Sequence, residues 1–383
     1  MKYQFAVTNL SFMTGAPANA PCGKLSTSDR LTPLLRQSAE LLEWGDADWD
    51  LAIRQARHAG LVASIEARLR ACDMLPDVPD PPRAHLEAAR VLAEKHRVDV
   101  AREIRAIADA LAPLGVPIIL LKGAAYAAAG LPAAAGRLFG DIDILLPRER
   151  LEEAERLLVK AGWNTAKADD YDQRYYRDWM HELPPLQHER RQTAIDVHHT
   201  IVPPTSRFAV DGKRLRDAAV PVAALPGIAV LAPADMVLHS AAHLFTEGEF
   251  GRGLRDLCDL DRLLRHFAAR DPHFWDELGE RAAYFALERA LHYALRFAAS
   301  ILGTPVPERF LTLGAPPPLA AAAMDALLSR ALRPPHRSCA DRLTPLALFL
   351  LYIRGHYLRM PLGLLMPHLF RKAFITRLQP HSA

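Results

Sequence analysis

The chain has few of the features of a secreted, disulfide-bonded or membrane-spanning protein. Its 383 residues include only four cysteines, which lie far apart and form no CxxC or other zinc-ligand spacing. This pattern indicates free thiols in a reducing compartment, so we expect a cytoplasmic protein. The chain also lacks an uninterrupted apolar run of about 18 residues, which a spanning helix requires. No transmembrane segment is therefore predicted.

A strong excess of charge of one sign is also missing. Lys and Arg total 47 against 44 Asp and Glu, which gives a net charge of +3. This balance does not by itself indicate nucleic-acid binding, and any basic surface would have to be local. Half of the residues are hydrophobic, so the chain can bury a large core and form two or three lobes.

Helical periodicity precedes and follows a central segment with a different pattern. A Pro-rich break from Leu75 to Pro82 ends one helix, and a long helix is predicted from Ala84 to Leu111. The apolar segment from Leu346 to Phe370 favours a buried C-terminal helix pair, with an interfacial amphipathic helix as the alternative. We predict a disordered start at 1–27, a helical N-terminal lobe at 28–113, a core at 114–225 and a helical C-terminal lobe at 226–383.

The most informative stretch contains two acidic residues at strand spacing. An apolar run ends at Lys122-Gly123, and Gly140 comes directly before Asp141-Ile142-Asp143, which begins a second apolar run. Residues two apart on a strand point to the same face, so Asp141 and Asp143 would stand side by side. Two ionised carboxylates beside an apolar strand are costly unless a cation lies between them. A hard divalent ion with oxygen ligands, Mg²⁺ above all, is the natural candidate.

A third acidic residue follows in an apparent hairpin, whose strands are predicted at 181–187 and 193–201 around the charged turn 189–192. Asp196 alternates there with apolar neighbours and shares a face with His198. We expect His198 to orient Asp196 through a hydrogen bond. His198 and His199 point to opposite faces of a strand, so this pair does not predict a zinc site.

Two later segments are weaker candidates. His239 and His243 have zinc-protease spacing but lack the required Glu after the first His, so a polar helix stripe is expected. Between Gly251 and Leu264, two arginines lie three residues apart, as do two aspartates. We expect these residues to form structural ion pairs first, with a role in a ligand pocket left open. These residues are Arg252, Arg255, Asp256 and Asp259.

The central motifs resemble a known family. Leu-Lys-Gly at 121–123, Arg137, Gly-Asp-Ile-Asp-Ile-Leu-Leu at 140–146 and Gly162-Trp163 after a helix are similar to the uncharacterised bacterial nucleotidyltransferase family, within the superfamily of DNA polymerase beta. The resemblance runs from His58 to about Arg265. It implies an α/β (α+β) class, with a nucleotidyltransferase-like mixed sheet flanked by helical N-terminal and C-terminal lobes.

The resemblance also implies metal-dependent transfer of a nucleoside monophosphate from a nucleoside triphosphate such as ATP. In the family's scheme Asp141 and Asp143 bridge two Mg²⁺ ions, with Mn²⁺ as the alternative, and Asp196 holds the ion that activates the attacking hydroxyl. The implied nucleotide and phosphate contacts are Lys122, Gly123, Arg137 and Gly140, with His198 behind the metal ligands. Lys122-Gly123 stands where many superfamily members carry Gly-Ser.

No residue pattern identifies the acceptor substrate. The resemblance implies a sugar, a modified peptide, a protein side chain or a tRNA end. The alternative function is of a different class: a catalytically inactive nucleotidyltransferase fold that serves as a binding or interaction module. The presence of all three acidic residues, Asp141, Asp143 and Asp196, argues against it. Phosphohydrolase or kinase-like chemistry on the same metal site has no separate motif in its support.

Overall fold

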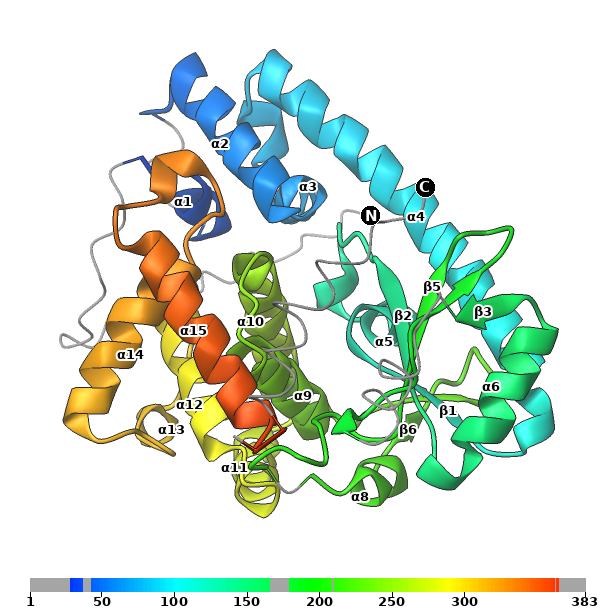
Figure 1. Ribbon diagram of the computed structural model, residues 1–383. Coiled ribbons are helices and arrows are strands. Elements are labelled where there is room, and N and C mark those ends of the chain that lie inside the picture. Colours follow the sequence, from blue (N-terminus) through cyan, green and yellow to red (C-terminus); the bar gives the residue numbers. More distant parts are fainter. Residues whose placement is uncertain (1–27, 37–42, 166–178, 209, 362, 365–383) are drawn as a thin grey trace, which may run out of the picture.

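The computed structural model describes residues 28–36, 43–165, 179–208, 210–361 and 363–364. The predicted disordered start at 1–27 lies outside these ranges. Helices before and after one mixed sheet build the fold (Figure 1), which confirms the predicted α/β class. Cys258 and Cys339 are free thiols. Within the described ranges, none of the helices has the length and hydropathy to cross a membrane.

The sheet found in the described residues has seven strands in the order β3-β4-β5-β2-β1-β7-β6. Strand β2 lies at its centre, antiparallel to β1 and parallel to β5. Strand β1 is in turn parallel to β7, and the remaining neighbours are antiparallel. The strands are β1 Ile118–Leu120, β2 Asp141–Leu145, β3 Trp163–Thr165, β4 Leu186–His188, β5 Ala194–His198, β6 Val220–Pro221 and β7 Ile228–Val230.

The helices before the sheet end in one long helix that reaches it. They are α1 Leu31–Arg36, α2 Asp46–Ala59, α3 Val62–Ala71 and α4 Asp80–Leu111. Helix α4 begins before the predicted Ala84 because Pro81 and Pro82 lie in its first turn, where a missing N–H breaks no helical hydrogen bond. From the N-terminal helices it continues along the sheet (Figure 1), where it contacts α5 Lys122–Ala128 and α6 Leu151–Lys160.

A buried acid ties α4 to the hairpin that β4 and β5 form. The Glu103 carboxylate is buried and accepts hydrogen bonds from Arg191 at 2.7 and 3.0 Å and from Thr193 at 2.7 Å. Arg191 lies in the hairpin turn and Thr193 directly precedes β5. Helix α4 therefore fixes the point at which β5 begins.

The helices after the sheet surround α9, which is buried along most of its length. Helix α9 contacts α10, α11, α12 and α15 and lies between them and α5 (Figure 1). The sheet and these helices share one hydrophobic core. The helices after the sheet are α9 Pro233–Thr246, α10 Gly253–Arg270, α11 Phe274–Tyr284, α12 Glu288–Phe297, α13 Glu308–Leu311, α14 Pro318–Ala331 and α15 Thr344–Arg359, and α8 Gly212–Asp217 precedes β6.

Helix α15 differs from the buried helix that its composition favours. Leu351 and Gly355 are buried on one side, but Leu346 and Phe349 are 52% and 58% exposed. The prediction of a buried C-terminal helix is therefore wrong for residues 344–359, because the helix buries only a narrow stripe. The division into lobes at 113 and 225 stays a prediction, and strand β7 belongs to the sheet although it lies beyond 225.

Candidate active site

Asp141, Asp143 and Asp196 lie on one face of the sheet, on the adjacent strands β2 and β5. The strands are parallel, and their register aligns Asp143 with Asp196 and Asp141 with Ala194. Residues two apart on a strand share a face and register partners lie side by side, so the three carboxylates are neighbours. Asp141 is exposed, Asp196 is partly buried and Asp143 is only 4% exposed. The cluster therefore opens to solvent at Asp141 and reaches the interior at Asp143.

Burial and neighbouring charges shift the pKa values of Asp143 and Asp196 in opposite directions. Burial, together with the carboxylates of Glu182 and Asp143, raises the pKa of Asp196 to about 7. Burial alone would also raise the pKa of Asp143, but Lys122 and His198 outweigh it, and that pKa is well below its usual range. Two neighbouring carboxylates repel each other when both are ionised, so the pair favours a shared proton or a bound cation.

His198 contacts the most buried carboxylate of the cluster. Its Nε2 lies 3.1 Å from Asp143 Oδ1, and its Nδ1 lies 3.2 Å from Glu182 Oε2. The predicted hydrogen bond to Asp196 is thus replaced by one to Asp143, because the ionised and more buried carboxylate is the stronger acceptor. Burial would lower the pKa of His198, but its contacts with Asp143 and Glu182 raise it. His198 therefore supports Asp143 from behind.

Lys122 stands at the junction of β1 and α5 and also contacts Asp143. Its backbone φ is +46°, which is uncommon for a non-glycine residue. Its Nζ lies 3.1 Å from Asp143 Oδ1. Burial would lower the pKa of Lys122, but Asp143, Glu247 and Asp141 raise it overall. Lys122 thus remains charged and compensates Asp143, and its bond and that of His198 both go to Oδ1.

Gly123 and Arg137 pack together beside the acidic cluster. A Cβ at position 123 would collide with the Phe139 ring and would lie 2.9 Å from Arg137 Nε, so only glycine fits without a shift. The Arg137 guanidinium pairs with Asp259 of α10 and lies 3.8 Å from Asp256. Burial and the nearby Arg255 lower the pKa of Arg137. The arginine is thereby held between the sheet and α10.

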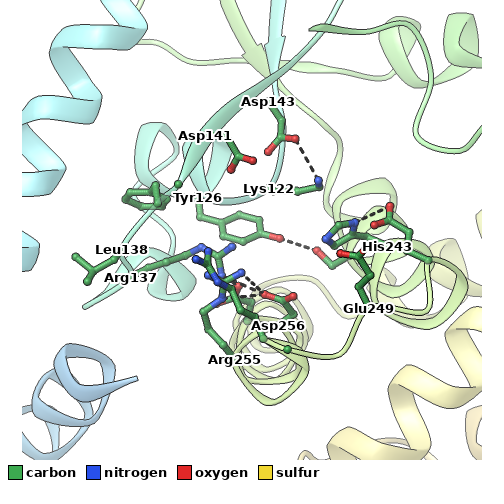
Figure 2. Close-up of a pocket in the computed structure, with 18 residues that line it drawn as sticks. Lys122, Tyr126, Arg137, Leu138, Asp141, Asp143, His243, Glu249, Arg255 and Asp256 are labelled. Carbon is green, nitrogen blue, oxygen red and sulfur yellow. Dashed lines mark hydrogen bonds and ion pairs between the residues drawn. The ribbon is translucent and has the colours of Figure 1, made fainter. Parts of the chain in front are cut away.

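These residues line a cavity of about 430 Å³ between β2 and the N-terminal part of α10. Figure 2 shows Asp141 and Asp143 on one side of it and Arg137 and Arg255 on the other. Among the described residues that line the cavity, Asp196 is absent, because it lies beside Asp143 on the neighbouring strand. The full lining is Lys122, Gly123, Tyr126, Arg137, Leu138, Phe139, Gly140, Asp141, Asp143, Ser240, His243, Glu247, Glu249, Gly251, Arg252, Arg255, Asp256 and Asp259.

Several lining residues belong to the loop and helix that were weaker candidates in the sequence. Arg255 pairs with Asp256, at 2.7 Å between Nη2 and Oδ1, and the acid at 259 pairs with Arg137, so the expected ion pairs form within the cavity wall. His243 Nδ1 lies 2.7 Å from Glu247 Oε1, and His239 is buried. No motif in the sequence singles out Glu182, which enters the site through its contact with His198.

A family model described as an uncharacterised nucleotidyltransferase matches residues 45–303. The chain belongs to this nucleotidyltransferase family. The match covers more than half of the chain and extends beyond the predicted range of His58 to about Arg265 at both ends. No curated protein and no solved structure was found to match.

Membership of the family identifies the chain as a transferase that moves nucleotidyl groups. The matched range includes α2 to α12, the whole sheet and every residue that lines the cavity. The cavity and the carboxylate cluster beside it therefore belong to the part of the chain that defines this nucleotidyltransferase family.

Proposed function

We propose that this nucleotidyltransferase binds a nucleoside triphosphate with Mg²⁺, or Mn²⁺, in the cavity between β2 and α10. The observation that carries the proposal is the opposition of two kinds of charge across this cavity. Asp141 and Asp143 face it from one side, and Arg137 and Arg255 face it from the other (Figure 2). Arg252 also lines the cavity, where Asp259 and Asp256 pair with Arg137 and Arg255. Carboxylate oxygens suit a hard divalent ion, and guanidinium groups suit phosphate oxygens. A metal-bound triphosphate presents both partners at once.

Asp141, Asp143 and Asp196 would hold the divalent ions. Their oxygen-only donor set fits Mg²⁺. The raised pKa of Asp196, about 7, reflects its burial and the nearby negative charge, and a cation would offset that charge. Bound ions of this kind neutralise charge on the attacking and leaving oxygens of an in-line displacement. Lys122 and His198 both donate to Oδ1 of Asp143, which orients its Oδ2 toward a ligand.

The chain's own groups then direct the transfer. The acceptor hydroxyl oxygen attacks the α-phosphorus, the bond from this phosphorus to the bridging oxygen breaks, and pyrophosphate leaves. Asp196 receives the hydroxyl proton. Arg252 and Arg255 hold the phosphates that become pyrophosphate, and Lys122 keeps Asp143 ionised. The acceptor belongs to one of the classes that the family resemblance implies: sugar, modified peptide, protein side chain or tRNA end.

Isothermal titration calorimetry with each of the four nucleoside triphosphates tests the proposal. The wild type is titrated with and without Mg²⁺ and compared with Asp141→Asn, which removes one exposed charge from the cluster. A matched control is Asp217→Asn, which removes an exposed acid that pairs with Lys213 outside the cavity. We expect Mg²⁺-dependent binding of at least one triphosphate, weakened about tenfold or more in Asp141→Asn, a loss of ~1.4 kcal/mol, and unchanged in Asp217→Asn.

Absence of triphosphate binding by the folded wild type would contradict the proposal and favour the non-catalytic interaction module. Equal binding by wild type and Asp141→Asn would place the nucleotide elsewhere. The preferred base then selects the labelled triphosphate for acceptor screening, in which pyrophosphate release from the wild type and not from Asp141→Asn reports the transfer.

A further inference from the structure

Three side chains behind the acidic cluster converge on one another: His181, Glu182 and His198. Each offers one ligand atom, and these atoms lie within 4.8 Å of one another. His181 and His198 are 7% and 3% exposed, and their rings stack with centroids 5.1 Å apart. This cluster lies apart from the cavity, because none of the three lines it among the described residues.

Backbone pairing fixes the cluster in place. Glu182 forms an antiparallel bridge with His198, the His199 N–H donates to the His181 carbonyl at 2.8 Å, and the Leu183 N–H donates to the Val197 carbonyl at 2.9 Å. The segment that carries His181 and Glu182 is therefore held against the end of β5. The three side chains meet because of this pairing and not through a chance surface contact.

With His198 neutral, the hydrogen bonding of the cluster is incomplete without a cation. A neutral imidazole has one N–H, and when His198 Nε2 donates to Asp143, its Nδ1 lone pair faces Glu182 Oε2 at 3.2 Å. Neither His198 Nδ1 nor His181 Nδ1 has a hydrogen-bond partner in the part of the chain that is described. Buried polar atoms usually have partners, so two orphan imidazole nitrogens on residues that cluster with a carboxylate point to a ligand.

We infer that His181, Glu182 and His198 bind a divalent transition-metal ion of the Zn²⁺ class, separate from the Mg²⁺ of the active site. Two imidazoles and one carboxylate suit Zn²⁺ and its neighbours, whereas Mg²⁺ prefers oxygen ligands only. Ligand atoms on a tetrahedral ion with bonds of about 2.1 Å lie ~3.4 Å apart. The ligand atoms of the three side chains lie within 4.8 Å of one another. Shifts of about an ångström would therefore bring them to the separation that a bound ion requires.

The position of this ion determines its role. With His198 Nδ1 on the metal, the N–H is fixed on Nε2 and donates to the Asp143 carboxylate, which accepts it as carboxylates do from many metal-bound histidines. His181, Glu182 and His198 are positioning residues, because they act on the substrate only through Asp143. The ion would hold Asp143 in the orientation that its catalytic role requires.

Absorption spectroscopy with Co²⁺, as a coloured substitute for Zn²⁺, tests the inference on the full chain. Co²⁺ is titrated in the presence of a large excess of Mg²⁺, which occupies oxygen-only sites. We expect one equivalent of Co²⁺ to bind with visible absorption bands of a site of low coordination number, and Zn²⁺ to displace it. Glu182→Gln, which keeps the side-chain shape, and His181→Ala should each weaken binding at least tenfold.

Two controls keep this inference distinct from the proposed function. Asp141→Asn alters the active-site cluster and should bind Co²⁺ like the wild type, even if it no longer binds triphosphate. His292→Ala removes another buried histidine with an orphan Nδ1 and should also bind Co²⁺ normally. Loss of Co²⁺ binding in Asp141→Asn with retention in Glu182→Gln would overturn the inference, and so would the absence of Co²⁺ binding by the folded wild type. His198 would then be an imidazolium that bridges two carboxylates.

Discussion

Asp143 and Asp196 are register partners on parallel strands, yet their pKa values move in opposite directions. Lys122 and His198 both donate to Asp143 and keep it ionised. Asp196 lies beside that negative charge and near Glu182, and its pKa is about 7. In the metal-free protein, therefore, Asp196 holds a proton below neutral pH that an unfolded chain would release near pH ~4.

The first prediction concerns Asp196→Asn without metal. Because the folded-state pKa is raised, the folded wild type is favoured at low pH and loses stability as the pH rises from about 4 to about 7. The neutral amide has no such loss. Asp196→Asn should therefore be more stable than the wild type at about pH 8, by roughly 2–4 kcal/mol, and similar to it near pH ~4. Urea denaturation in the presence of a chelator measures the difference.

The second prediction concerns Arg252→Gln. Arg252 lines the cavity, and its Nη1 would lie 3.8 Å from a Cβ at position 140, directly before Asp141. Loss of this charge should weaken triphosphate binding about tenfold, ~1.4 kcal/mol, because charge-assisted bonds to phosphate are strong. The melting temperature should change little. Arg270→Gln at the far end of α10 is the control, and equal weakening by both variants would count against a local contact.

The third prediction concerns Gly123→Ala. The added methyl group would collide with the Phe139 ring and would approach Arg137. We expect a loss of about 1–3 kcal/mol in the free energy of unfolding, with weaker triphosphate binding because Arg137 is displaced. Gly251→Ala, whose Cβ would meet nothing within 4 Å, should leave the free energy of unfolding nearly unchanged. A stable Gly123→Ala variant would mean that Phe139 can move aside freely.

The fourth prediction concerns the buried acid of α4. Glu103→Gln keeps the shape of the side chain but removes the charge that binds Arg191 and weakens the bond from Thr193. The free energy of unfolding should fall by about 1–3 kcal/mol. Glu94→Gln on the exposed side of α4, which pairs with Arg90, should change it by less than ~0.5 kcal/mol. Similar losses in the two variants would show that burial of Glu103 is unimportant.

Local patterns were sufficient to predict the elements that carry the carboxylates. Asp141 and Asp143 begin an apolar run and do lie in β2, and the charged turn before Asp196 does connect β4 to β5. Both features depend on the alternation of apolar and polar residues and on turn residues within about ten consecutive sequence positions. The predicted start of α4, Ala84, is four residues too late, because prolines in sequence usually mark a break, whereas the first helical turn accepts Pro81 and Pro82.

Contacts between distant segments could not be predicted in the same way. The pairing of Arg137 with Asp259 joins residues far apart in the sequence, and the approach of Glu182 to His198 depends on a backbone bridge outside the main strands. Periodicity reports which side of an element is buried but not which partner it meets. His198 was therefore expected beside Asp196 on its own strand, whereas its ring bonds to Asp143 on β2.

The hydrogen bonds around Glu103 bear on the length of the shortest fragment that would keep the active site in place. A polypeptide that began at residue 114 would keep Asp141, Asp143 and Asp196, but the strand that carries Asp196 would lose an anchor on α4, the Glu103 carboxylate that binds Arg191 and Thr193. We therefore expect the smallest autonomous enzyme to include α4, which lies within the family match that begins at residue 45. Helix α4 is in this sense part of the unit that holds the carboxylates and not an appendage to it.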